Sequence, residues 1–390
     1  MRLARSLLLA GAAALVAACA GAPEAARAPA SLFHDDRFQA PQERVSTEDV
    51  FTLSEPMRRY LAFDIARQLR TLGAKAGLVA ALYQKGQLQL EYDTATTRTA
   101  ADTFAARSGN CLSLVLMTAA FARELKLEVS YGSALLEESW SRNGDFLFAT
   151  GHVNVTLGGP TVDAGKHFDP GALTIDFLPP EQARRLRRRE IGEATVVAMY
   201  ANNHAAEALA AGHLDAAYAW AREAVRGDPA FLAAWNTLGV VYLRHGDADA
   251  AAPVFEHALA LDDRNTRALA NLAETYSRLG RPADADAVRL RLAAVEPFPP
   301  FHFFRLGLAA MDRGEYAAAR ELFTREVGRA DSQHEVHFWL ALADWRLGDA
   351  DEAKKQLALA AGSSPTGGQH DLYAAKLAWL KSQSGPSRRP

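Results

Sequence analysis

Apolar residues recur at helical spacing along most of the chain, and alanine, the strongest helix former, is used heavily. The pattern changes in one internal stretch, where apolar and polar residues alternate with a period of two. Strands are expected in that stretch at 127–135, 146–157 and 161–165. Helices are expected before it at 54–72, 76–84, 97–107 and from residue 111 to about 125. The pattern therefore predicts an α+β region followed by an all-α region.

The C-terminal half repeats with a period of 34 residues. Each period carries a glycine, and these are Gly212, Gly246, Gly280, Gly314 and Gly348. Large apolar residues lie at fixed offsets around it, for example Trp235, Tyr242 and Phe255 in the second period. Glycine adopts a positive φ at little cost, so each is expected in the turn between two antiparallel helices.

This pattern resembles the tetratricopeptide repeat (TPR). The resemblance implies five two-helix units over residues 198–366, stacked into a solenoid, with a capping helix and a disordered tail over 367–390. Such solenoids bind peptides or proteins, and the candidate partner-binding residues are Asn202 and Asn236, polar positions on first helices. The alternative is that these asparagines are only solvated, because a repeat fixes a surface but not its ligand.

The N-terminus has the pattern of an export signal. Arg2 and Arg5 precede an apolar run at 7–18, which is too short to span a bilayer stably. The sequence Val16-Ala17-Ala18-Cys19 resembles the lipobox of bacterial lipoproteins, which implies cleavage before Cys19 and acylation of that residue. The alternative is an ordinary signal peptide with a chance cysteine.

With alanine after the cysteine, the lipoprotein resemblance implies an outer-membrane lipoprotein that faces the periplasm. Residues 1–18 would be the signal peptide, and 19–45 the lipidated cysteine and a flexible tether rich in alanine and proline. Three apolar residues in this tether, Leu32, Phe33 and Phe38, suggest that part of it docks on the domain that follows.

Composition narrows the class of protein. The 390 residues are 49% hydrophobic and 23% charged, which is typical of two or three globular domains. A net charge of −3 argues against a general nucleic-acid binder. The only two cysteines, Cys19 and Cys111, exclude a disulfide framework and a cysteine-based zinc cluster. After lipidation of Cys19, Cys111 would be a lone thiol in an oxidising compartment.

Cys111 opens a strongly apolar helix, whose free N–H groups and dipole stabilise a thiolate. A thiolate nucleophile needs a base and a group that orients the base. His152 begins the strand 152–157, in which Asn154 shares its face. If residue 156 pairs with residue 161, Asp163 lies opposite Asn154 and diagonal to His152, at a Cα distance of roughly 7–8 Å.

The motifs Gly109-Asn110-Cys111, Gly151-His152-Val153 and Val162-Asp163 resemble the transglutaminase-like branch of the papain-like fold. The resemblance implies a transglutaminase-like α+β domain over 46–182. In it, Cys111 would be the nucleophile, His152 the base and Asp163 the orienting group for acyl transfer from a peptide or amide bond. The acyl group would pass to water or to an amine.

Two positions depart from the transglutaminase-like pattern, so the resemblance does not define how a substrate would be oriented at the site. Asn154 stands where an aromatic residue commonly follows the family's histidine, and Ala164 follows the aspartate. His167 and Asp169 remain alternatives for the orienting group.

The competing hypothesis is a catalytically inactive TPR lipoprotein that acts as a scaffold or pilotin-like assembly factor in the cell envelope. Cysteine is often a small buried apolar residue with no chemical role. An active site predicts an exposed sulfur in a cleft near His152, whereas a scaffold predicts a buried, inert thiol at Cys111.

The remaining signals predict no cofactor and no metal. The arginine-rich stretch at 183–197 is expected to be a solvated linker, with an acidic partner or anionic lipid as the alternative. His334 and His337 are three residues apart, which is not the spacing of a helical zinc motif. No glycine-rich phosphate loop appears. The expected partners are a protein or peptide on the repeats and a membrane at Cys19, with no nucleic acid.

Overall fold

The computed structural model describes residues 27–41, 43–83, 88, 90–93, 96–143, 146–158, 171–177, 187–329, 333–364 and 367–383. The chain divides into two compact units. The first contains Met1–Ser133 and Val153–Val288, and the second contains Ala134–His152 and Arg289–Pro390. Among the described residues, no helix is both long enough and apolar enough to cross a membrane.

Short helices form the start of the first unit. They are η2 (Ala30–Leu32), η3 (Asp35–Arg37), α2 (Glu55–Arg59), η4 (Tyr60–Asp64), α3 (Ala66–Leu72) and α4 (Ala74–Tyr83). The helix expected over 54–72 is therefore broken, because a π-helical turn at η4 ends at Ile65. Ser54 is the N-cap residue and Pro56 lies in the first turn, as expected, although the serine side chain makes no capping hydrogen bond.

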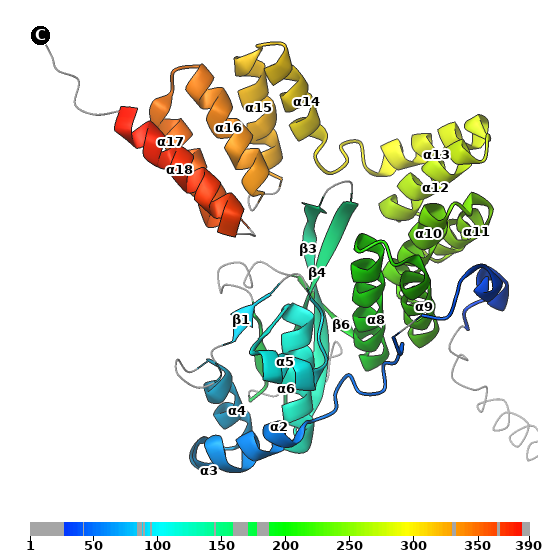
Figure 1. Cartoon of the computed structure of the whole chain (residues 1–390), viewed down its shortest axis with the longest axis vertical. Helices are drawn as coiled ribbons and strands as arrows, with labels where there is room; N and C mark the ends of the chain where they lie inside the picture. Colours follow the sequence, from blue (N-terminus) through cyan, green and yellow to red (C-terminus); the bar gives the residue numbers. More distant parts are fainter. Residues whose placement is uncertain are drawn as a thin grey trace, which may run out of the picture. The chain divides into compact units, whose positions relative to one another are not determined.

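A small parallel sheet and two helices follow. The elements are β1 (Glu91–Tyr92), α5 (Ala100–Ala106), β2 (Ser108–Gly109) and α6 (Cys111–Glu124). Helix α6 starts at Cys111, as predicted, and twelve of its residues are buried. In Figure 1, α5 and α6 lie beside each other in front of the larger sheet.

The larger sheet has the order β5-β4-β3-β6. Its strands are β3 (Val129–Asn143), β4 (Phe146–Leu157), β5 (Leu173–Ile175) and β6 (Arg187–Ile191). The apolar face of β4 contributes Val153, Val155 and Leu157 to one hydrophobic core with α6, as the alternation predicts. Strand β6 occupies part of the stretch that we expected to be a linker.

The predicted strand pairing is wrong. Strand β4 pairs antiparallel with β5, in a register that places Thr156 opposite Thr174 and Val155 opposite Ile175. Thr156 was expected to pair with residue 161, whereas the two neighbours of β4 in the described sheet are β5 and β3. Residues 161–165 lie outside the described part of the chain.

Eleven helices make up the rest of the described chain. They are α8 (Glu193–Ala210), α9 (Leu214–Gly227), α10 (Leu232–His245), α11 (Ala248–Leu261), α12 (Thr266–Arg278), α13 (Pro282–Val295), α14 (His302–Asp312), α15 (Tyr316–Val327), α16 (His334–Arg346), α17 (Ala350–Gly362) and α18 (Gly367–Gln383). All five glycines of the 34-residue period have positive φ, between 69° and 100°, as predicted.

The repeats do not form a single compact unit. The boundary between the two units falls after Val288, inside α13. Helices α8–α12 therefore belong to the first unit and α14–α18 to the second.

Candidate functional sites

The first helices of the first three repeats, α8, α10 and α12, are neighbours within the first unit. We call the surface that they share the first-helix face. It carries both predicted partner-binding residues, each of which is half-buried. The Asn236 Oδ1 accepts a hydrogen bond of 2.8 Å from Asn271 Nδ2 on α12. The Asn202 Oδ1 is buried without a hydrogen-bond partner.

An unsatisfied buried amide oxygen costs stability, so a donor that reached Asn202 would offset that cost. Close to it on α8, His204 stacks on Trp220 with the ring centroids 4.7 Å apart. Burial lowers the pKa of His204, and its buried Nε2 has no hydrogen-bond partner. The first-helix face thus carries the amide side chains of Asn202, Asn236 and Asn271, and the stack of His204 on Trp220 joins α8 to α9.

Cys111 lies at a well-capped helix N-terminus. The Asn110 side chain accepts a hydrogen bond of 2.9 Å from the Ser113 N–H and donates one of 2.8 Å to Thr97 Oγ1. Asn203 of α8 also donates to Thr97 Oγ1, at 3.1 Å, and the Thr97 N–H donates to Glu207 Oε1 at 2.8 Å. The start of α6 is therefore tied to the first repeat helix through Thr97.

Tyr92 is the residue that meets the thiol. The parallel pairing of β1 with β2 sets Tyr92 beside Gly109, two residues before the cysteine. The tyrosine hydroxyl lies within hydrogen-bonding reach of the Cys111 thiol and backbone N–H. Burial of the hydroxyl raises the pKa of Tyr92, and the nearby thiol and Asp176 carboxylate raise it further. Tyr92 is 51% exposed, whereas Cys111 is only 6% exposed.

Asp176 occupies the position that we predicted for Asp163. The register of β4 and β5 places Asp176 next to Asn154, and Asn154 Nδ2 donates to Asp176 Oδ2 at 3.2 Å. The expected pairing gave the position opposite Asn154 to Asp163, and the observed register of β4 and β5 gives it to Asp176. Asp163 and the alternatives His167 and Asp169 lie outside the described residues. Asp176 is close enough to Tyr92 to influence its pKa, so Cys111, Tyr92, Asp176 and Asn154 surround one small region.

His152 is 2% exposed, on β4. Strand alternation places its side chain on the same face of β4 as Asn154 and Thr156, as predicted. The buried thiol, by contrast, is what the scaffold hypothesis predicted and not the exposed sulfur expected of an active site. Cys19, the predicted lipidation site, is outside the described residues.

Two residues of this region were missed at the sequence level. Asp176 follows the alternating run Leu173-Thr174-Ile175, which is a strand signal comparable to that of 161–165. Tyr92 has no such signal, and it meets the thiol only because β1 pairs with β2. No local pattern in the sequence indicates that pairing.

The described residues include no group of three or more histidine, cysteine, aspartate or glutamate side chains that could hold a metal ion. The two histidines of α16 have protein partners. His334 Nδ1 lies 3.0 Å from the Tyr373 hydroxyl, and His337 Nδ1 lies 2.8 Å from Gln356 Oε1.

Family models of the tetratricopeptide repeat match residues 202–265, 242–302 and 304–367. The chain therefore contains tetratricopeptide repeats, as predicted. These matches cover less than half of it, and none includes the region of Cys111. A search among curated proteins gives no match.

Among solved structures, a thermophilic TPR protein from Thermus thermophilus is 22% identical. The similarity covers 46% of this chain and 99% of that protein, with a TM-score of 0.30. The pilF protein of Pseudomonas aeruginosa is also 22% identical, over 47% of this chain and 84% of its own, with a TM-score of 0.30. YrrB, a TPR protein with an unusual peptide-binding site, is 20% identical over 46% of this chain and 92% of its own, with a TM-score of 0.25. These scores are too low to establish a common arrangement of the whole chain.

Proposed function

We propose that the protein is an interaction scaffold that binds a protein partner through its tetratricopeptide repeats. The observation that carries this proposal is the first-helix face, where Asn202 has an unsatisfied buried oxygen and Asn236 pairs with Asn271. Amide side chains at such positions can exchange hydrogen bonds with the backbone of an extended peptide. The buried state of Cys111 also fits a scaffold better than a thiol enzyme.

Site-specific photo-crosslinking tests this function. A photoreactive amino acid at position 236 should yield a discrete crosslinked species in cells, because that position faces the proposed partner. The matched control is position 290 on α13, where the native leucine is 73% exposed. The same label there should yield no such species. Identical products from both positions, or none from 236, would refute a partner on the first-helix face.

A second candidate function is acyl transfer by the Cys111 thiol, as in transglutaminase-like enzymes. The observation that favours it is the clustering of Tyr92, Asp176 and Asn154 around the helix start that carries Cys111. In this candidate, Cys111 sulfur attacks the carbonyl carbon of an amide and His152 accepts the thiol proton. His152 then returns that proton to the amine that leaves, and the resulting thioester passes its acyl group to water or to another amine.

In this candidate, Asp176 replaces Asp163 as the acidic group near the base. The test is iodoacetamide alkylation of the Cys111 thiol in the folded chain, with Cys19→Ser to remove the other thiol. Rapid alkylation at pH 6 that slows in His152→Ala would support the thiol chemistry. Alkylation that occurs only in denaturant would exclude it and leave the scaffold function.

The proposed setting is the periplasmic face of the outer membrane, with Cys19 as the lipid anchor. It rests on the lipobox resemblance of the sequence before Cys19. Metabolic labelling with a radioactive fatty acid should mark the wild-type chain but not Cys19→Ser. Equal labelling of both chains, or labelling of neither, would refute the anchor.

A further inference from the structure

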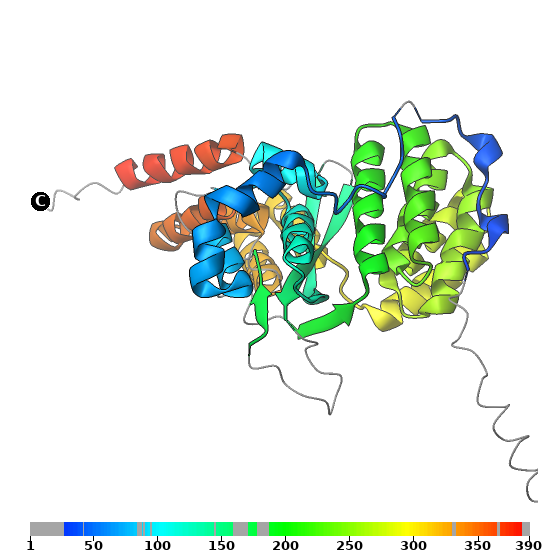
Figure 2. The same ribbon diagram turned by 90° about the horizontal axis from the view of Figure 1, so that it is seen from below.

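Residues 27–41 lie against the first two repeats. We expected this stretch to dock on the domain that follows it, but it packs on helices almost two hundred residues away in the sequence. Figure 1 and Figure 2 show the segment, in dark blue, running along the outer side of α9 and α11. Helix η2 contacts α11 directly.

Aromatic rings hold the segment at two points. The Phe38 ring is stacked on Tyr218 of α9, with the centroids 4.0 Å apart and the planes 3° from parallel. The Phe33 ring lies over Trp235 of α10, with a centroid distance of 6.4 Å. The Tyr242 hydroxyl accepts from the His34 N–H and donates to the Leu32 carbonyl oxygen, both at 3.0 Å. These contacts recognise the backbone of the segment as well as its side chains.

Two oppositely charged residues between the rings meet complementary partners. Arg37 donates to both oxygens of Asp249 on α11, at 3.3 and 3.0 Å, which is a bidentate pair. The Asp35 Oδ1 accepts from the Tyr218 hydroxyl at 2.7 Å and from Arg222 of α9 at 2.6 Å. The hydrogen bond from Tyr218 and the Arg222 charge lower the pKa of Asp35. The charges on the repeats therefore fix both the position and the direction of the segment.

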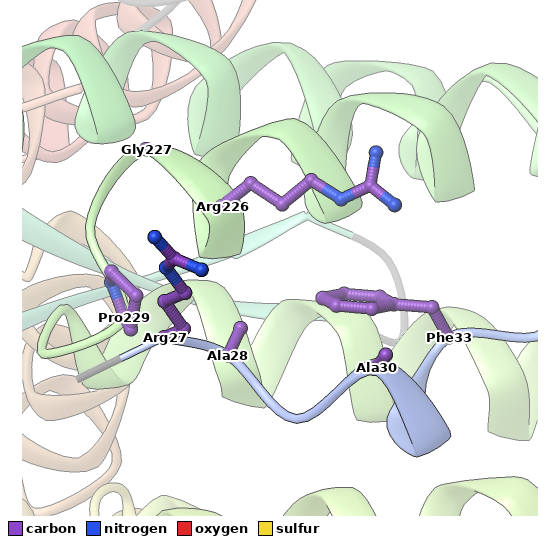
Figure 3. A pocket seen from close by; sticks show the side chains of 7 residues that line it. All are labelled: Arg27, Ala28, Ala30, Phe33, Arg226, Gly227 and Pro229. Carbon is purple, nitrogen blue, oxygen red and sulfur yellow. The ribbon is translucent and has the colours of Figure 1, made fainter.

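The segment leaves part of this surface unfilled. A cavity of about 430 Å³ lies at its N-terminal flank, between Phe33 and the end of α9. Figure 3 shows Arg226, Gly227 and Pro229 on the repeat side, with Ala28 and Ala30 on the side of the segment. The small alanine side chains leave room that a larger side chain would occupy.

The charged contacts are also solvent-accessible, since the side chain of Asp249 is 65% exposed and that of Asp35 is 56% exposed. Exposed ion pairs give specificity but little affinity. A segment held in this way is specific for its surface and can be displaced from it.

We propose that this surface of α9, α10 and α11 is a binding site for a linear peptide, and that residues 33–39 are a built-in ligand. The external ligand is a partner segment with the same order of aromatic, acidic, basic and aromatic side chains. The inference does not depend on the first-helix face, because it uses neither Asn202 nor Asn236.

The test uses the full chain and a fluorescent peptide with the sequence of residues 29–41. A double substitution, Arg37→Ala with Phe38→Ala, weakens the built-in ligand and leaves the repeat surface intact. The tethered segment acts at an effective concentration of roughly millimolar. We therefore expect the peptide to bind the double variant at least about tenfold more tightly than wild type, by fluorescence anisotropy.

A charge-reversing substitution on α11 tests whether the peptide binds to the proposed surface of the repeats. Asp249→Lys, added to the double variant, should weaken peptide binding several-fold, because it removes the bidentate partner of peptide Arg37 and places a lysine against it. Glu274→Lys on α12 is the matched control, since Glu274 is an exposed, ion-paired carboxylate away from the segment. It should leave the affinity unchanged. Circular dichroism confirms that each variant is folded.

Three results would overturn the proposal. One is the absence of peptide binding to the folded double variant. Another is equal binding to wild type and to the double variant. The third is binding that Asp249→Lys and Glu274→Lys affect equally.

Discussion

Single residues determine how closely the helices of a repeat pack. A Cβ atom at Gly239 would lie 2.5 Å from the Phe255 ring, and one at Gly307 would lie 2.4 Å from the Phe323 ring. Both rings are fully buried, so they have little room to move. The glycine of the first helix and the phenylalanine of the second are therefore matched in size in two different repeats.

Gly239→Ala should lower the free energy of unfolding by about 1–3 kcal/mol, as expected for overpacking in a core. Chemical denaturation measures the change. Gly362→Ala is the control, because a Cβ there meets nothing within 4 Å. The control should change stability by no more than about 0.5 kcal/mol. Equal losses in both variants would show that the contact with Phe255 is not the cause.

Asp344 is an acidic residue whose side chain is buried in the folded chain. It is fully buried on α16, and neither of its carboxylate oxygens has a hydrogen-bond partner. Burial raises the pKa of Asp344 to about 6, although the nearby Arg320 opposes the shift. Because the pKa of the folded state exceeds that of the unfolded state, ionisation of Asp344 destabilises the fold as the pH rises from about 4 to 6.

Asp344→Asn should remove this dependence on pH. The difference in unfolding free energy between the variant and wild type should shift by roughly 1–3 kcal/mol in favour of the variant between pH 4 and pH 7. Urea denaturation at both pH values measures it. Asp312→Asn, at an exposed position on α14, should show no such shift. A constant difference for Asp344→Asn would contradict the assigned ionisation.

At the scale of elements, the start of α6 depends on one capping residue. Asn110 accepts from the Ser113 N–H and donates to Thr97, which Asn203 and Glu207 of α8 also contact. A helix N-terminus leaves several backbone N–H groups unsatisfied, and the cap supplies one acceptor. The same side chain thus stabilises α6 and connects it to the first repeat.

Asn110→Ala should cost about 1–2 kcal/mol of stability, because it removes the cap and the bond to Thr97. Asn110→Asp keeps the acceptor for the Ser113 N–H and adds a negative charge that the helix dipole favours. It should therefore lose much less, in the same denaturation assay. Equal losses of stability in the two variants would show that the hydrogen bond to Thr97, and not the cap, accounts for most of the contribution of Asn110.

The sequence predicted the structure best where a structural feature depends only on residues that are close together in the chain. The five turn glycines, the start of α6 at Cys111 and the extent of β4 all follow from propensities within a few residues. Strand pairing is not local in this sense. The stretches that contain Asp163 and Asp176 both alternate, and nothing in either determines which one pairs with β4. The docking of Phe33 and Phe38 was predicted, but its surface on distant repeats was not.

At the scale of the whole molecule, the repeats belong to two compact units, and each has its own features. The first unit contains the first-helix face, the surface that holds residues 33–39 and the Cys111 region. The second contains α14–α18, with the contacts of His334 and His337 to other helices and the buried carboxyl group of Asp344.

The scaffold function and the thiol-enzyme function depend on different residues of the chain. A scaffold needs the first-helix face and does not need the sulfur of Cys111. A thiol enzyme needs the sulfur whether or not a partner is bound. The substitution Cys111→Ser therefore separates the two functions with a small change in side-chain volume.

The most direct measurement is the photo-crosslink yield from position 236 in cells, compared between the wild-type chain and Cys111→Ser. Our account predicts a discrete partner species of equal yield in both chains, and none from the control position 290. The absence of that species in the wild-type chain, or its loss when only the sulfur is replaced, would contradict the central claim that the protein is a partner-binding scaffold.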